Sequence, residues 1–141
     1  MTMSTQDVPT ERVRYLSLDW IDALTNAVAA SSEMTAVARN HSVGFTQTVL
    51  GGPEGDVTYH LQIGDGVASF GPGPAHPEDV RFEQDWETAV AVATHVLNAQ
   101  QAFITGRIRL TGDSQKLMDS TPVFAVLDSI FSTVREFTDY R

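Results

Sequence analysis

The stretch NAQQAFITGRIRLTGD, residues 98–113, decides the predicted fold of this chain. Its pattern indicates the end of a helix, a tight turn and then one strand. Ile108 and Leu110 point to one side of that strand, because successive strand side chains alternate between two faces. Arg107 and Arg109 point to the other side. The strand therefore has one apolar face and one charged face.

Two glycines, Gly106 and Gly112, lie at the two ends of the predicted strand. Glycine accepts a positive φ or a close backbone approach without steric cost, so both positions suit turns. Asp113 follows directly and can cap a short helix predicted near residues 114–119. The stretch thus predicts a helix, a strand and a second helix in this order.

Length and composition limit the possible architectures. A chain of 141 residues, of which 42% are hydrophobic, can bury roughly two thirds of its unfolded surface, enough for one core but too little for two ordinary domains. We predict a mobile N-terminal arm at residues 1–10, where polar residues lack periodicity, and a single domain at residues 11–141. The absence of cysteine excludes disulfides, thiolate metal sites and a cysteine nucleophile, and it is typical of a reducing cytoplasm.

Charge and hydropathy narrow the range of partners. The formal charge of −9 and the pI of about 4.6 repel phosphates and anionic lipid headgroups, so we expect no nucleic-acid partner. Residues 1–10 lack the basic start and apolar run of a signal peptide, and no apolar run approaches the ~18 residues of a membrane span. We expect a soluble, cytoplasmic protein without stable membrane insertion.

The first predicted helix follows Ser17, whose side chain can cap it. This helix ends near Ser31. Its apolar stripe consists of Trp20, Leu24, Ala27 and Val28. We predict a loop at residues 34–40 after it.

Four further strands are predicted around a proline-rich connector. The connector at residues 71–77 contains three prolines, which remove backbone donors and exclude a helix or an interior strand. Alternation before it predicts strands at residues 43–50, 57–63 and 67–70, the first two joined as a hairpin by residues 51–56. Residues 79–83 predict another strand after it, and Asp85 caps a helix that runs to about Asn98.

The last predicted helix is apolar over a wide surface. It begins near Pro122, a residue favoured in the first turn of a helix. One stripe consists of Phe124, Leu127, Phe131 and Val134. An adjacent stripe consists of Val123, Val126, Ile130 and Phe137. Covering one side of a core needs about one such stripe, so the second needs a neighbouring helix, a partner subunit or a lipid to cover it.

Several of these segments together resemble the sterol carrier protein 2 (SCP2) sterol-binding domain family. They are DVRFEQD at residues 79–85, the alanine-rich helix after it, AFITG at residues 102–106, and the strand that ends in Gly112 and Asp113. Weaker similarity extends from about Trp20 to Phe137. The resemblance implies an α+β fold in which helices cover a twisted, mainly antiparallel, five-stranded sheet.

The resemblance also implies a function and a site. Members of the SCP2 family enclose an apolar tunnel for sterols, fatty acids or acyl-CoA, partly closed by the C-terminal helix. We therefore predict non-catalytic binding and transfer of such a molecule, without a cofactor or a metal. The candidate wall and lid positions are Phe103, Ile108, Leu110, Leu117, Met118, Phe124, Leu127 and Phe131.

Three other interpretations stay open. The apolar residues can form an ordinary packed core. A small enzyme could transfer protons on a steroid-like substrate if a carboxylate, or a tyrosine such as Tyr59, faced the cavity. The domain could instead be an interaction or dimerisation module that uses the last helix as its interface, either with a protein partner or as a homodimer.

The polar residues give weaker signals. A histidine and two carboxylates lie close together at residues 76–79, but the proline between them hinders convergence on a metal ion. The chain has no nucleophile elbow, P-loop or dinucleotide-binding motif. Arg107 and Arg109 either keep a solvated strand face polar or dock the head group of an anionic ligand. The acidic charge disfavours shuttling along anionic membranes and favours exchange with a protein partner.

Overall fold

The computed structural model describes residues 13–136 and 138–140 of the chain. The arm predicted at residues 1–10, and Phe137 of the predicted last helix, lie outside the described residues. The strands are β2 (Val13–Arg14), β3 (Val43–Gly52), β4 (Gly55–Gly64), β5 (Val67–Pro72), β6 (Val80–Asp85), β7 (Ile108–Gly112) and β8 (Thr138–Asp139). The helices are α1 (Leu18–Ala30), α2 (Ser32–Ala38), α3 (Trp86–Ala93), α4 (Ala99–Ile104), α5 (Ser114–Asp119) and α6 (Thr121–Arg135).

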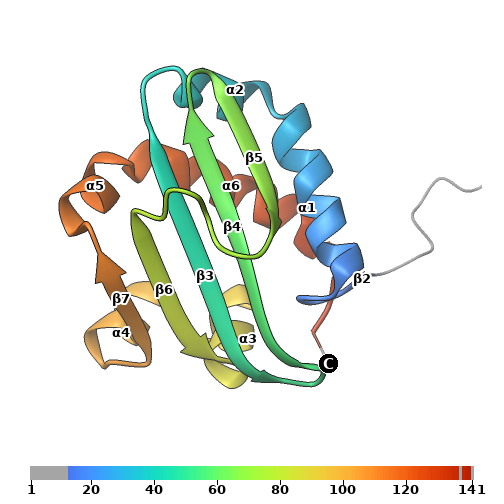
Figure 1. Ribbon diagram of the computed structural model, residues 1–141. Coiled ribbons are helices and arrows are strands. Elements are labelled where there is room, and N and C mark those ends of the chain that lie inside the picture. Colours follow the sequence, from blue (N-terminus) through green and yellow to red (C-terminus); the bar gives the residue numbers. More distant parts are fainter. Residues whose placement is uncertain (1–12, 137, 141) are drawn as a thin grey trace, which may run out of the picture.

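A five-stranded sheet forms the centre of the molecule, in the order β5-β4-β3-β6-β7 (Figure 1). Within it only β3 and β6 run parallel, so the predicted mainly antiparallel sheet is confirmed. β2 and β8 form a separate parallel pair of two-residue strands. Strands this short show no alternation, which is why the sequence pattern does not predict them.

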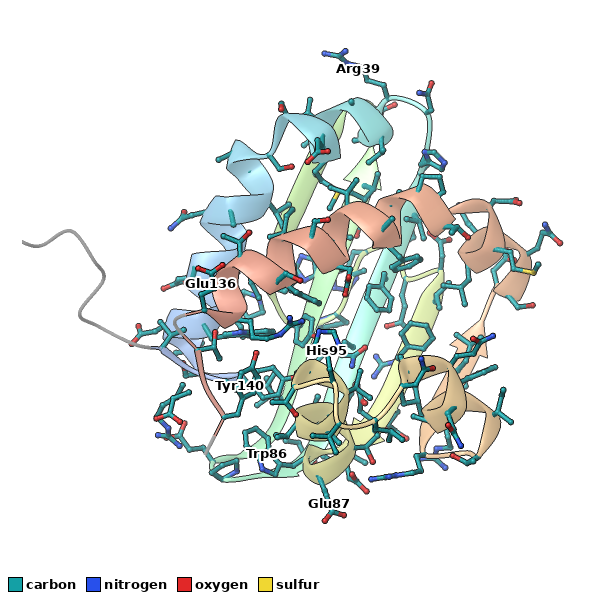
Figure 2. The ribbon with its side chains drawn as sticks, turned by 180° about the vertical axis from the view of Figure 1, so that it is seen from behind. Arg39, Trp86, Glu87, His95, Glu136 and Tyr140 are labelled. Carbon is teal, nitrogen blue, oxygen red and sulfur yellow. The ribbon has the colours of Figure 1, made fainter. Side chains whose placement is uncertain are left out.

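Helices cover one face of this sheet. Figure 1 shows the sheet in front of α3, α4 and α6, and Figure 2 shows α6 crossing the sheet from behind. α1 packs along β5 and also contacts α6. The largest fully buried side chains come from both layers and include Leu24, Met34, Leu61, Ile63, Val80 and Val123. The predicted α+β class, with helices over a five-stranded sheet, is confirmed.

The proline-rich connector between β5 and β6 lies across the opposite face of the sheet (Figure 1). His76 N–H donates a hydrogen bond to Gln62 Oε1 at 2.9 Å. The connector lies so close to β3 that a Cβ atom at Gly44 would stand 1.8 Å from the Pro77 carbonyl oxygen. It also covers Thr46, which is fully buried. This polar face is therefore held by hydrogen bonds to the connector, while the apolar face receives the helices.

Three predicted N-caps are confirmed, and they fix where α1, α3 and α5 begin. Ser17 Oγ accepts a hydrogen bond from Trp20 N–H at 3.2 Å, Asp85 Oδ1 from Thr88 N–H at 2.7 Å, and Asp113 Oδ1 from Lys116 N–H at 3.0 Å. Each side chain satisfies a backbone donor that has no partner inside its helix. Pro122 lies in the first turn of α6, also as predicted.

The single helix predicted from Asp85 to about Asn98 is wrong. α3 ends at Ala93, and His95 has a left-handed backbone with φ of 64°. Asn98 begins the second helix, α4, because its Oδ1 accepts hydrogen bonds from the N–H groups of Gln100 and Gln101 at 2.8 and 3.2 Å. Asparagine favours this capping role over a helix interior. The quoted stretch at residues 98–113 therefore opens with a complete short helix.

The loop predicted at residues 34–40 is also wrong, because α2 occupies most of it. Ser31 ends α1 and at the same time caps α2, since its Oγ accepts a hydrogen bond from Met34 N–H at 3.0 Å. Met34 and Ala38 are buried on the inner side of this short helix. The predicted hairpin is present, but its strands extend to Gly52 and Gly55 and leave a much shorter turn.

The wide apolar surface of α6 is covered within the chain. Val123, Leu127 and Val134 are buried, while the other apolar members of the two predicted stripes that the structure describes are half-buried. α1 and α2 both pack against α6. The second apolar stripe needed a neighbouring helix, a partner subunit or a lipid to cover it. Neighbouring helices of the same chain therefore provide most of this cover.

Candidate functional site

An apolar cavity of about 350 Å³ lies between α4 and the inner face of the sheet. This volume falls within the range of about 300–1,000 Å³ that is usual for small-molecule sites. Its walls come from β3, β6, β7, α3, α4 and α5. The lining residues are Gln47, Phe82, Gln84, Val92, Ala99, Gln100, Phe103, Ile108, Leu110 and Leu117.

The sheet register brings the apolar rows of this cavity together. Phe82 of β6 pairs with Leu110 of β7, and Gln84 pairs with Ile108. These positions share one face because side chains alternate along each strand. Phe82 also pairs with Gln47 of the neighbouring strand β3. Two glutamines therefore stand among the apolar residues of the inner face.

A second, smaller cavity of about 200 Å³ lies beside the C-terminal half of α6. We call it the polar cavity, because three tyrosines and an arginine border it together with apolar residues. Figure 2 shows His95, one of its lining residues, between α3 and α6. Its lining residues are Tyr15, Trp20, Tyr59, Val92, Ala93, His95, Leu97, Asn98, Ala99, Asp128, Phe131, Arg135 and Tyr140.

The two cavities adjoin at α3 and α4. Val92 of α3 and Ala99 of α4 line both of them. The short connection between these helices therefore passes over the boundary between an apolar chamber and a polar one. A molecule with an apolar body and a polar end fits this combination better than a wholly apolar molecule does.

Three tyrosines border the polar cavity, and all remain protonated near neutral pH. Burial raises the pKa of Tyr15 well above its ordinary value, and its neighbours Tyr59 and Tyr140 add to the rise. Burial raises the pKa of Tyr59 in the same way. Burial also raises the pKa of Tyr140, against the opposing effect of Arg135, which hydrogen-bonds to it. The three hydroxyls can therefore donate hydrogen bonds but do not supply negative charge.

Two polar atoms near these cavities have no partner. Among the described residues, Gln84 Oε1 and Arg135 Nε are buried and lack a hydrogen bond. An unpaired buried polar atom costs free energy, about 1–3 kcal/mol in typical cases. Gln84 is only 7% exposed. Such atoms are rare in folded proteins and call for an explanation.

Five of the eight predicted site residues line a cavity. Phe103, Ile108, Leu110 and Leu117 line the apolar cavity, and Phe131 lines the polar cavity. Leu127 is buried in the core, and Phe124 packs against Phe45 with ring centroids 5.0 Å apart. Met118 is 69% exposed and borders neither cavity.

Sequence reasoning named Tyr59 as a residue that could face a cavity, but it missed other polar members of both cavities. Side chains alternate between the two faces of a strand, which puts Gln84 on the same face as Val80 and Phe82 of β6 and Gln47 on the same face as Phe45 and Val49 of β3. This alternation was a usable signal, because it places both glutamines on the apolar face. No comparable signal exists for Tyr15, Arg135 and Tyr140, which come from distant parts of the chain.

The two arginines of the quoted stretch do not act as a pair. Arg109 forms an ion pair with Glu83 of β6, on the polar face of the sheet. Arg107 precedes β7, and its Nε donates a hydrogen bond to Thr88 Oγ1 of α3 at 3.2 Å. Neither arginine lines the apolar or the polar cavity.

The described residues offer no metal centre. Within residues 13–136 and 138–140, no group of three or more histidine, cysteine, aspartate or glutamate side chains could hold a metal ion. No helix of this part of the chain is both long enough and apolar enough to span a membrane.

The comparisons with known proteins agree with this architecture. The model of the SCP-2 sterol transfer family matches residues 25–125. A crystal structure of sterol carrier protein 2 is similar at 20% identity and a TM-score of 0.60, covering 88% of this chain and 99% of that one. Sterol carrier protein 2 from Yarrowia lipolytica, in its apo form, has 13% identity and a TM-score of 0.58, with 84% and 96% covered.

A third structure is the sterol carrier protein domain 2 of Helicoverpa armigera. It shares 20% identity with this chain at a TM-score of 0.53, over 92% of this chain and 96% of that one. At identities this low, the structural similarity shows a shared fold alone. Comparison with curated protein sequences gives no match.

Proposed function

Because this chain belongs to the SCP-2 sterol transfer family, we propose that it binds an apolar molecule such as a sterol, a fatty acid or an acyl-CoA and transfers it unchanged. The observation that carries this proposal is the apolar cavity of about 350 Å³ beneath α4. Its walls are mainly hydrocarbon, from both the sheet and the helices. Burial of a ligand's hydrocarbon surface in such a site is favourable by about 25 cal/mol per Å².

The expected affinity suits a carrier. Drug-sized ligands gain about 0.3 kcal/mol per non-hydrogen atom, so a sterol of roughly 28 such atoms gains about 8 kcal/mol. This free energy corresponds to a dissociation constant of about 1 μM. A carrier needs affinity of this order, because it must also release its cargo.

A non-catalytic role is part of the proposal. Proton transfer on a steroid-like substrate needs a carboxylate or another base near the bound molecule. The described residues that line the apolar cavity include no carboxylate and no histidine. Tyr59 borders the polar cavity, but burial raises its pKa, so it stays protonated and can donate a hydrogen bond but not take up a proton. Asp128 and His95 also border the polar cavity, and both are exposed to solvent. The enzyme interpretation therefore has less support than the carrier.

The net charge of the chain bears on how it would pass on its ligand. With a formal charge of −9, the chain is repelled by anionic membranes, so the proposal favours exchange with a protein partner in the cytoplasm. The predicted homodimer through the last helix has little support, because α1 and α2 cover the apolar stripes of α6.

The test uses a large side chain at the boundary of the cavities. Val92 is half-buried and lines both, so Val92→Trp should fill the boundary and lower the affinity for a fluorescent fatty acid or sterol at least tenfold. Val96 follows in the same connection but is 80% exposed, so Val96→Trp is the matched control. Fluorescence titration measures the affinity of each variant for the fluorescent ligand. Equal binding by the two folded variants would show that the ligand lies elsewhere.

A further inference from the structure

The strand β7 forms an open edge of the sheet. Among the described residues, the sheet ends at β7, which pairs with β6 on its inner side and with no strand on its outer side (Figure 1). Alternate backbone N–H and C=O groups of β7 therefore point away from the sheet. The opposite edge is covered, because α1 packs along β5. β7 is thus the edge at which a further strand can be added.

A groove of about 450 Å³ runs along this open edge, and we call it the edge groove. Its lining includes side chains from both faces of the sheet, so the groove follows the edge itself. Three residues that also line the apolar cavity form its apolar side: Phe103, Ile108 and Leu110. Its polar side consists of Arg81, Glu83, Arg109 and Thr111. An occupant of the edge groove therefore touches the wall of the apolar cavity.

We propose that the edge groove binds an extended segment of a partner protein in which apolar and acidic side chains alternate. The segment adds a strand beside β7. In this mode of recognition the backbone supplies hydrogen bonds, and alternate side chains supply specificity. The inference rests on the proposed function, because it gives the exchange partner a place to dock beside the apolar cavity.

The apolar side chains of the segment follow from the apolar side of the groove. Phe103 is 47% exposed and borders the groove together with the half-buried Ile108 and Leu110. Side chains of an added strand stand opposite those of β7 on the same face, with Cβ atoms about 4.5–5.5 Å apart. Apolar side chains at every second position of the segment would cover these three residues.

The acidic side chains of the segment follow from the polar side of the groove. Arg81 and Arg109 line this side with one carboxylate, that of Glu83. Arg109 pairs with Glu83, but its side chain is 69% exposed, and a guanidinium group has five N–H donors. Residues 88–112 contain no aspartate or glutamate, although the whole chain carries a formal charge of −9. An acidic side chain therefore complements this part of the surface, and a basic one is repelled.

The same charges disfavour a second copy of this chain in the groove. Pairing of β7 with β7 of another copy would bring the Arg109 side chains of both copies to one edge. It would also join two chains that each carry a formal charge of −9. Charged side chains on edge strands commonly prevent such self-association, but they do not hinder a segment of opposite charge.

The test measures the binding of blocked peptides to the full-length protein by fluorescence polarisation. The peptides have about seven residues, a length usual for strands. Valine and glutamate alternate in the first peptide, and lysine replaces glutamate in the second. We expect the glutamate peptide to bind about fivefold or more tightly, because several surface ion pairs are lost in the lysine peptide. The net charge of the protein alone would favour the lysine peptide, so this preference reports on the groove.

Two further peptides test the backbone pairing. Both are glutamate peptides with N-methyl groups on alternate backbone nitrogens, one on the valines and the other on the glutamates. The N–H groups of an added strand point alternately toward β7 and away from it. One methylated peptide should therefore lose at least tenfold in affinity, while the other binds like the unmethylated peptide.

A charge variant assigns the preference to the groove. Arg109→Gln should remove most of the preference for glutamate over lysine. Arg39→Gln is the matched control, because Arg39 is also exposed but lies at the end of α2, outside the groove (Figure 2). Hydrogen–deuterium exchange adds a local measurement. Alternate amides of β7 should exchange more slowly when the glutamate peptide is bound.

Several outcomes would overturn this inference. They are equal affinities for the glutamate and lysine peptides, equal effects of the two methylated peptides, and an unchanged preference in Arg109→Gln. A dimer in sedimentation that the glutamate peptide dissociates would assign the groove to a second copy of this chain. Binding to phosphatidylcholine vesicles that the same peptide abolishes would assign it to a membrane. Either result would contradict the acidic partner segment.

A fluorescent fatty acid, titrated into the same samples, separates this inference from the proposed function. Uptake of the fatty acid by a protein that binds no peptide would overturn the docking segment and leave the carrier function standing. Peptide binding by a protein that takes up no fatty acid would contradict the carrier function and leave the docking surface standing.

Discussion

Gln84 is a residue whose buried acceptor lowers the stability of the fold. Its side-chain oxygen is buried without a partner, whereas methionine has a similar shape and no strong acceptor. Gln84→Met should therefore raise the free energy of unfolding by about 1 kcal/mol, measured by urea denaturation. The gain reflects removal of an unpaired acceptor.

The control for this prediction lies on the other face of the sheet. Gln62 Oε1 accepts a hydrogen bond from His76 N–H at 2.9 Å, so Gln62→Met should lower the free energy of unfolding by about 1 kcal/mol. A loss of stability in both variants would show that Gln84 has a partner after all.

Gly44 is fixed by the backbone that lies against it. A Cβ atom there would stand 1.8 Å from the Pro77 carbonyl oxygen, and backbone cannot yield as a flexible side chain does. Gly44→Ala should lower the free energy of unfolding by about 3 kcal/mol or more, measured in urea. In Gly71→Ala the nearest atom to the new Cβ is the His60 ring at 3.4 Å, so this control should change little. Similar stabilities of the two variants would mean that the connector is free to move away from β3.

Asp85 gives the fold a dependence on pH. Hydrogen bonds from the Thr88 backbone and side chain lower the pKa of Asp85 below its ordinary value. A lowered pKa in the folded state adds stability above the unfolded pKa, about 3.9, and this stability is lost as the pH falls through the folded pKa. Asp85→Asn keeps a cap but removes the charge.

The variant should therefore be less stable than the original protein at pH 7 and equally stable near pH 2, compared by urea denaturation. Asp56→Asn is the control, because it exchanges the same charge for an amide near the start of β4, away from the N-terminus of any helix. The amide oxygen of asparagine can keep the hydrogen bond that Asp56 Oδ1 accepts from Gly51 N–H at 2.8 Å. A stability difference for Asp85→Asn that stays constant with pH would contradict the role of its charge.

At the level of the element, the sequence predicted starts of helices better than their ends. Ser17, Asp85 and Asp113 were identified as caps because their side chains bond to backbone two or three residues away, which is local chemistry. Ser31 and Asn98 have the same chemistry, but each stands where a predicted helix ends, so its capping of a following helix was not predicted. Their caps create α2 and α4, which were therefore missed.

Asn98 links this local chemistry to the site. Its side chain caps α4, and α4 supplies Ala99, Gln100 and Phe103 to the apolar cavity. Asn98→Ala should cost about 1 kcal/mol of stability, with faster amide exchange in α4 and weaker ligand binding. Hydrogen–deuterium exchange measures the local effect.

Asn98→Asp is the matched variant, because aspartate caps a helix equally well. It should keep the slow amide exchange of α4. Unchanged exchange in Asn98→Ala would show that packing, and not the cap, holds α4 over the cavity.

At the level of the whole molecule, the apolar half of the candidate site was predictable, whereas of the polar half only Tyr59 was. Ile108 and Leu110 were found from alternation in one strand, and the cavity does contain them. Arg135, Tyr15 and Tyr140 meet only because the β2–β8 pair brings the two ends of the described chain together. Nothing in the neighbouring sequence encodes that meeting, so spacing alone cannot reveal it.

The proposed carrier function also depends on the molecule as a whole, because the cavities need the sheet, α3, α4 and α6 in place together. Native mass spectrometry of the purified protein tests it most directly. We predict that each chain retains or takes up one small apolar molecule. The Val96→Trp variant should also carry one such molecule, whereas the Val92→Trp variant should carry none. A protein that shows only its own mass, even after incubation with sterols and long-chain acids, would contradict the existence of a lipid site.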